Sequence, residues 1–117
     1  MVRIYNMHGA TVRSSKNLLG VLTHYRYNPC DIVVKVKEAP RDGRPYDYDV
    51  TFFWPNGDKA DTQWADWRVL LNWLQARRSW SIARVTFDAP LFDKHENDER
   101  FTIFRKTCAP LTRLTQL

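Results

Sequence analysis

The chain has 117 residues, of which 44% are hydrophobic and 14% aromatic, and its formal net charge is +5. This length predicts one domain, and the aromatic content excludes a disordered chain. No apolar run approaches the roughly 20 residues of a membrane span, and the start MVRIYNMHGA is too short and too polar for a signal peptide. We therefore expect a cytoplasmic protein without a membrane partner.

The first elements are a strand and a helix. Arg3–Met7 predicts a short edge strand, and the dipeptide His8-Gly9 predicts the turn that follows it. Ser14 and Ser15 are candidate N-caps of a helix. The apolar residues of this helix recur at helical spacing, namely Leu18, Leu22 and Tyr25. Asn28-Pro29 is expected to end the helix.

Three strands are expected next. Residues 32–37 alternate apolar and more polar side chains, which predicts a strand with one buried face. After a loop at 40–45, the segment Tyr46–Trp54 alternates in the same way. Asn56-Gly57 is a strong hairpin signal, and the return strand is expected at Lys59–Gln63. The face of the middle strand expected to be buried carries Tyr48, Val50, Phe52 and Trp54.

The second half begins with the clearest helix. Asp66 is its expected N-cap, and its apolar stripe holds Trp67, Leu70, Leu71 and Leu74. A strand is expected at Ile82–Phe87 and should end at Ala89-Pro90. We expect Asp93–Glu99 to be an acidic loop, Phe101–Phe104 to be a last strand, and the tail after Pro110 to be loosely held.

The predicted element order is β-α-β-β-β-α-β-β. Such an order favours a single α+β domain over residues 1–117, with one antiparallel sheet packed against two helices.

Residues that commonly carry catalysis are scattered. His8, His24 and His95 are isolated, and His95 lies in the expected acidic loop, which we interpret as solvated rather than as a cation site. Cys30 and Cys108 share no metal-ligand spacing and are interpreted as reduced packing residues. The sequence therefore predicts no metal site, no cofactor and no enzyme.

Tryptophan and arginine gather in the second helix. Four tryptophans fall within seventeen residues: Trp64, Trp67, Trp73 and Trp80. Tryptophan and arginine dominate the residues that carry binding energy at protein interfaces. We therefore predict that the partner-binding residues are Trp73, Arg77, Arg78 and Trp80, accompanied by Arg68. The alternative that all four tryptophans pack beneath the sheet stays open.

A second candidate patch lies on the outward face of the middle strand. It comprises Asp47, Asp49 and Phe53. Asp47 and Asp49 share a face and so form a candidate carboxylate pair, but catalytic carboxylates need environments that separate their pKa values. No neighbouring residue in the sequence indicates such environments, so we interpret the pair as solvent-facing.

Three segments resemble a known family. RIYNMHGATVRSSKNLLGVL resembles the start of the small early protein by which short-tailed coliphages inhibit the host dGTP triphosphohydrolase. YDVTFFWPNGDKADT resembles that family's hairpin, and DWRVLLNWL resembles its following helix. The positions that match include Arg3, Tyr5, Gly57, Leu70 and Trp73, and the resemblance covers roughly residues 3–80.

The resemblance implies a non-catalytic phage or mobile-element protein in the cytoplasm of a bacterial host. Such a protein would bind and inhibit a host enzyme, with a multi-subunit dGTP triphosphohydrolase as the implied target. A nuclease of a defence system stays open as another target.

Two other classes remain open. Basic segments at 1–30 and 67–87 would line one face if the chain were a small nucleic-acid-binding module, and its affinity would then fall steeply with salt. A small enzyme would require a pocket that holds His24 or His95 with a strongly perturbed pKa.

Overall fold

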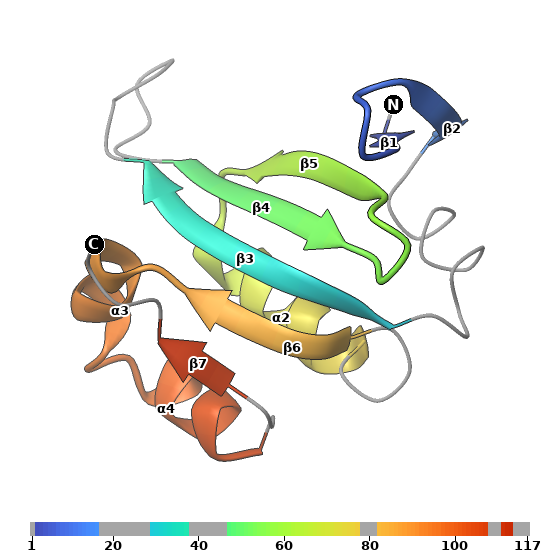
Figure 1. The fold of residues 1–117 in the computed structure, drawn as a ribbon. Helices are drawn as coiled ribbons and strands as arrows, with labels where there is room; N and C mark the ends of the chain where they lie inside the picture. The colour runs from blue at the N-terminus through green and yellow to red at the C-terminus, as the bar shows by residue number, and fades with distance from the viewer. Residues whose placement is uncertain (1, 17–28, 38–46, 78–81, 108–110, 114–117) are drawn as a thin grey trace.

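The computed structural model describes residues 2–16, 29–37, 47–77, 82–107 and 111–113. Within these ranges, seven strands form one mixed sheet in the order β2-β1-β5-β4-β3-β6-β7 (Figure 1). The strands are β1 (Val2–Tyr5), β2 (Thr11–Ser15), β3 (Cys30–Lys37), β4 (Asp47–Phe53), β5 (Lys59–Trp64), β6 (Ile82–Phe87) and β7 (Leu111–Arg113). The chain is thus an α+β domain, as the sequence predicts.

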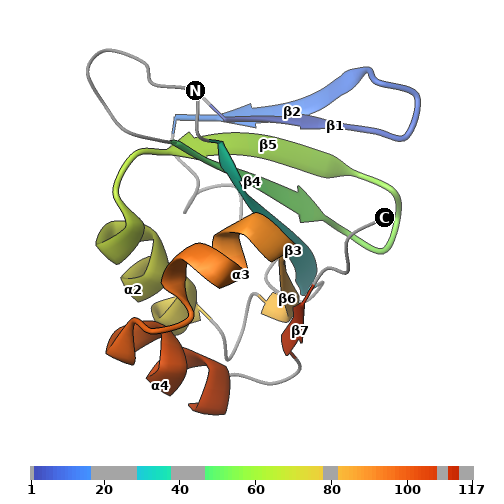
Figure 2. The ribbon, with the colours of Figure 1, turned by 90° about the vertical axis from the view of Figure 1, so that its left-hand side faces the viewer.

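Three described helices cover one face of the sheet. They are α2 (Trp67–Arg77), α3 (Ala89–His95) and α4 (Glu99–Thr107), and Figure 2 shows them together on one side. Their buried side chains belong to one core with those of the strands: Trp67, Leu70, Leu71, Leu74, Leu91, Phe101 and Phe104. We call the covered side of the sheet the inner face and the other side the outer face. No helix among the described residues has the length and apolar character of a transmembrane span.

The central strands follow the predicted alternation. Tyr48, Val50, Phe52 and Trp54 are all buried, and β4 pairs antiparallel with both β3 and β5. Because side chains alternate between the two faces of a strand, Asp49, Thr51 and Phe53 point to the outer face. The predictions for β3, β4 and β5 are confirmed.

The hairpin between β4 and β5 turns at Asn56-Gly57, as predicted. Gly57 has a φ of +93°, a conformation that glycine adopts without steric cost. The turn also contacts the hairpin between β1 and β2, because a Cβ at Gly57 would lie 2.9 Å from Met7 Cε. Gly57 therefore serves both the turn and the contact between the two hairpins.

Replacing Gly57 with alanine is expected to lower the free energy of unfolding by about 1–2 kcal/mol, because an L-residue is strained at this φ. Urea denaturation measures the loss. Gly9→Ala is the matched control for the backbone strain alone, since Gly9 has a φ of +82° but no atom within 4 Å of its added Cβ. A Gly57→Ala protein as stable as the wild type would contradict this account of the turn.

Helix α2 begins where the sequence predicts. The Asp66 carboxylate Oδ1 accepts hydrogen bonds from the backbone N–H groups of Arg68 at 2.9 Å and Val69 at 3.2 Å. These bonds satisfy two of the donors that the first turn of a helix leaves without partners. The cap fixes where α2 starts and therefore which of its side chains face the sheet.

The expected antiparallel sheet is wrong, because β6 pairs parallel with both β3 and β7. Parallel neighbours need a crossover connection, and α3 and α4 supply it between β6 and β7.

The last strand expected at Phe101–Phe104 is also wrong, because α4 covers these residues, and the expected loop at Asp93–Glu99 is reduced to the connection at 96–98 between α3 and α4. Asp88 Oδ1 caps α3 by accepting from Leu91 N at 3.0 Å, and Pro90 lies in the first turn. Asp98 Oδ1 accepts from Arg100 N at 2.9 Å, and its carbonyl accepts from Thr102 N at the same distance. Helical spacing then places Phe101 and Phe104 together in the core.

The N-terminal strand is correct in kind but not in place. β1 lies between β2 and β5, so it is not the edge strand that we expected. β2 was not predicted at all, and it contains Ser14 and Ser15, the expected helix caps. The rest of the expected helix, Cys108 and the residues of the tail beyond Arg113 lie outside the described residues.

Candidate functional site

Two indoles and a guanidinium form a cluster on the inner face, where the end of β5 meets α2. Trp64 at the end of β5 and Trp73 on α2 have ring centroids 5.6 Å apart at an interplanar angle of 55°. Arg77 Cζ lies 5.7 Å from the centroid of the Trp73 ring. All three side chains are half-buried. We call Trp64, Trp73 and Arg77 the α2 cluster.

Each member of the α2 cluster is held by its surroundings. Trp73 packs edge-on against the buried ring of Phe52 at 5.9 Å, and Trp64 Nε1 donates to Thr62 Oγ1 at 3.0 Å. Arg77 follows Trp73 by four residues, so the two side chains lie on one side of the helix. The rings are therefore anchored to the core while part of their surface stays accessible.

Helix α2 exposes apolar and basic residues. Val69, which precedes Trp73 by four residues and so lies on the same side of the helix, is 53% exposed, whereas Arg68, five residues before Trp73, is exposed on another side. Residues 67–77 include no aspartate or glutamate. This part of the surface therefore combines aromatic area with positive charge.

The other predicted site residues are divided between places. Arg78 and Trp80 lie outside the described residues, as does the side chain of Asp47. Asp49 and Phe53 lie on the outer face, Phe53 with 42% of its surface exposed. Because α2 packs on the inner face, the structure does not bring this second patch together with the α2 cluster.

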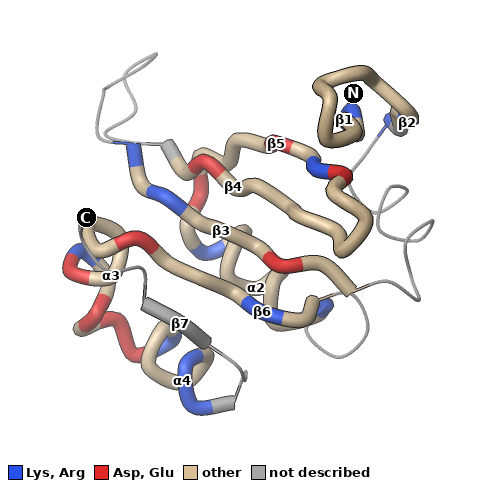
Figure 3. Tube along the Cα trace, viewed as in Figure 1, with Lys and Arg blue, Asp and Glu red and all other residues tan. Residues whose placement is uncertain are grey.

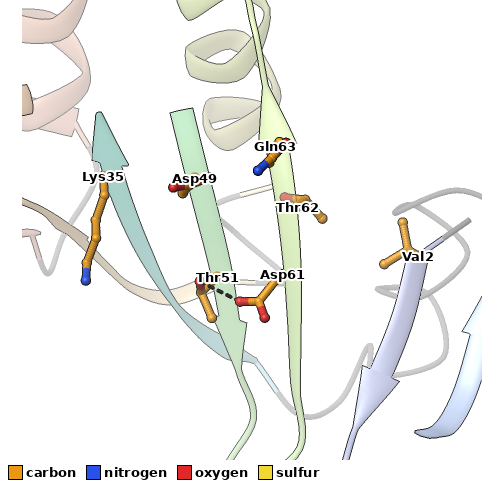
Figure 4. Close-up of a pocket in the computed structure, with 7 residues that line it drawn as sticks. All are labelled: Val2, Lys35, Asp49, Thr51, Asp61, Thr62 and Gln63. Carbon is orange, nitrogen blue, oxygen red and sulfur yellow. Dashed lines mark hydrogen bonds between the residues drawn. The ribbon is translucent and has the colours of Figure 1, made fainter. Parts of the chain in front are cut away.

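The outer face has an open groove of about 690 Å³ (Figure 4). It is lined by Val2, Lys35, Asp49, Thr51, Asp61, Thr62 and Gln63. Thr51 Oγ1 donates to Asp61 Oδ1 at 2.8 Å.

Opposite charges alternate across the strands of the outer face. Lys35 is opposite Asp49 in the register, and Asp31 is opposite Arg84; Figure 3 shows the signs interleaved along β3, β4, β5 and β6. Opposite charges at cross-strand positions stabilise a water-facing sheet. The outer face is thus close to electrostatic balance and resembles an ordinary solvated surface.

His95 is buried rather than solvated, so the expectation for it is wrong. It is only 9% exposed, and its ring stacks on the Trp67 indole with centroids 4.1 Å apart and an interplanar angle of 8°. His95 Nε2 lies 2.8 Å from Tyr48 Oη, and Trp67 Nε1 donates to Asp98 Oδ2 at 2.9 Å. We call these four residues the His95 network, and it joins α3 and the α3–α4 connection to β4 and α2.

Burial lowers the pKa of His95 below its ordinary value of 6.5, although the nearby Asp98 carboxylate opposes this shift. The folded protein therefore favours neutral His95, and the unfolded chain binds the proton more readily. The stability that this difference supplies is present above about pH 6.5 and is lost as the pH falls below that value, by at most about 1.4 kcal/mol per pH unit.

Guanidinium denaturation between pH 7.5 and pH 5 measures this dependence. We expect the wild type to lose stability over this range and His95→Gln, which does not titrate, to lose less. Equal slopes for the two proteins, or a wild type that becomes more stable as the pH falls, would contradict the assignment.

Among the residues that the structure describes, the remaining candidates do not assemble into a reactive site, and His24 and Cys108 lie outside these residues. Cys30 is buried in the core, and burial raises the pKa of its thiol to about 12, so the thiolate is scarce at neutral pH. Within the described ranges, no three histidine, cysteine, aspartate or glutamate side chains are placed to hold a metal ion.

Sequence reasoning named Trp73 and Arg77 but missed two features of the site. The pairing of Trp64 with Trp73 depends on how β5 lies against α2, which no local pattern reveals. The role of His95 follows from helix α3, whose available signal was Asp88 two residues before Pro90.

Comparison with known proteins adds no relative, because no family model, curated protein or solved structure matches this chain.

Proposed function

We propose that this chain is a non-catalytic protein that binds another protein through the α2 cluster and inhibits it. The observation that carries the proposal is the geometry of Trp64, Trp73 and Arg77, two anchored indoles with a guanidinium over the Trp73 ring, all three half-buried. Buried tryptophan and arginine supply much of the energy of protein interfaces. Anchoring side chains before binding reduces the entropy that association costs.

The charge around the α2 cluster favours a partner with acidic groups. Arg68 and Arg77 belong to a helix without carboxylates, so an approaching acidic surface meets no like charge on α2. Complementary charge raises association rates and disfavours wrong partners. The resemblance to phage inhibitors makes a host dGTP triphosphohydrolase the first target to test, and the proposed site of action is the host cytoplasm.

The nucleic-acid hypothesis needs the basic segments to share one face. In the described part of the chain, Arg84 lies on the outer face opposite Asp31, whereas Arg68 and Arg77 lie on the helix that covers the inner face. A continuous basic surface is what phosphate binding requires. The described arginines therefore favour the protein-binding proposal.

The test is the titration of a purified bacterial dGTP triphosphohydrolase with the chain while dGTP hydrolysis is followed. We expect saturable inhibition at a fixed ratio of the two proteins. We also expect Arg77→Glu to weaken it and Gln75→Ala, an exposed change on the same helix, to leave it intact. An enzyme that stays fully active in an excess of the chain would contradict the target, and equal inhibition by Arg77→Glu would contradict the binding face.

A further inference from the structure

Among the described residues, the side of β2 that faces away from β1 is a second surface, and the proposed function does not use it. β2 is the last strand of the sheet, and β1 is the one described strand that pairs with it. Thr11, Val12, Arg13 and Ser14 are all exposed. A strand in this position presents backbone N–H and C=O groups that can pair with a strand from another chain. We call this side of Thr11–Ser15 the β2 edge.

A bulge limits how long an added strand can be. Ile4 pairs with Arg13 and Tyr5 pairs with Thr11, so Val12 is an extra residue in β2. Bulges bend a strand and interrupt its ladder, and they protect edges against long pairings. The regular part of the β2 edge is therefore Arg13–Ser15, and Val12, which is 51% exposed, offers an apolar contact beside it.

The hairpin that presents this edge is already fixed. Asn6 Oδ1 accepts from the backbone N–H groups of His8 and Ala10, both at 3.0 Å, and Asn6 N donates to the Ala10 carbonyl at 2.9 Å. Met7 also lies against Gly57 of the neighbouring hairpin. A strand that is ordered before binding loses little conformational entropy when a partner adds to it.

The charge of the hairpin selects between possible partners. Residues 2–16 contain Arg3, Arg13 and Lys16 and no carboxylate. A second copy that paired antiparallel about Arg13 would place two arginines opposite each other, which is unfavourable, whereas an acidic residue opposite Arg13 would be favourable.

We propose that the β2 edge binds a short, extended, acidic segment of a partner protein by strand addition. Backbone hydrogen bonds to Arg13–Ser15 would supply affinity, and Arg13 and Val12 would supply preference for acidic and apolar side chains. This interaction does not depend on the α2 cluster, so either proposal can fail without the other.

The test titrates the isotope-labelled full chain with a capped peptide of alternating valine and glutamate, followed by amide chemical shifts. We expect the shifts to concentrate on Thr11–Ser15 and to vanish when the peptide backbone is N-methylated. Arg13→Glu should weaken binding about tenfold, since it turns a favourable cross-strand pair into a repulsive one. Lys59→Glu is the matched control. It changes the net charge by the same amount as Arg13→Glu, but on the outer face of β5, and should leave binding intact.

Three results would overturn the proposal. They are no shift at millimolar peptide, equal binding of a valine–lysine peptide, and shifts of Thr11–Ser15 that depend on protein concentration without any peptide. The last would show that a second copy occupies the edge.

Discussion

Replacing Trp67 with alanine is expected to lower the free energy of unfolding by about 3–5 kcal/mol, the usual range for removing a buried aromatic side chain. The Trp67 indole is only 8% exposed and has ring neighbours from four elements. Its ring centroid lies 5.4 Å from that of Tyr48, 6.4 Å from Phe87 and 5.4 Å from Phe101, besides the stack on His95. Its removal leaves a cavity where α2, α3 and α4 meet the sheet.

Guanidinium denaturation followed by circular dichroism measures this loss. Trp67→Phe is the informative control, because it keeps a ring but removes the donor to Asp98. Since water can reach this half-buried carboxylate, the loss of the hydrogen bond is expected to cost only about 1 kcal/mol. A Trp67→Ala protein that loses less than about 1 kcal/mol would contradict the packing described for the three helices, since the cavity cost would then be missing.

Replacing Trp73 with alanine is expected to weaken binding to the proposed protein partner by about 2 kcal/mol or more, which is roughly thirtyfold in Kd. The change removes the ring that contacts Trp64 and Arg77, so it dismantles the α2 cluster. Isothermal titration with the identified partner measures the effect.

Trp73 also packs against Phe52, so its loss affects stability as well as binding. Val69→Asp separates the two effects, because Val69 is exposed on the same side of α2 and supports no buried contact in the core. We expect Val69→Asp to weaken binding without changing the midpoint of thermal unfolding, and Gln75→Ala to change neither. Wild-type affinity in both Trp73→Ala and Val69→Asp would place the interface elsewhere.

The elements that sequence predicted correctly are those with strong local signals. The alternation in β4, the turn at Asn56-Gly57 and the cap at Asp66 each depend on neighbouring residues, and the structure confirms all three. Such signals survive folding because the sheet and the helix bury the faces that the periodicity marks.

The strand Ile82–Phe87 was predicted correctly, but the segment 93–104 was mispredicted because its short apolar run fits two periods. Phe101, Ile103 and Phe104 fit a strand, but the cap at Asp98 and the spacing from Phe101 to Phe104 fit a helix, and tertiary packing selects the helix. The parallel pairing of β6 with β3 could not be predicted either, since no local pattern indicates which strand β6 pairs with or whether the two run parallel or antiparallel.

The candidate site was predictable only where it is local. Trp73 and Arg77 meet because they are four residues apart on one helix, which sequence reveals. Trp64 joins them through the pairing of β5 with β4, and His95 reaches Tyr48 across forty-seven positions of sequence. Contacts of that kind depend on topology, and the topology was the part of the fold predicted least well.

Binding through the α2 cluster is tested by quantitative capture from nuclease-treated bacterial lysate with the tagged wild type, Val69→Asp and Gln75→Ala in parallel. We expect one stoichiometric protein that is retained by the wild type and by Gln75→Ala and is depleted from Val69→Asp. Equal recovery by all three chains would contradict binding through the α2 cluster. Recovery of nucleic acid alone, in lysate without nuclease, would contradict a protein-directed function altogether.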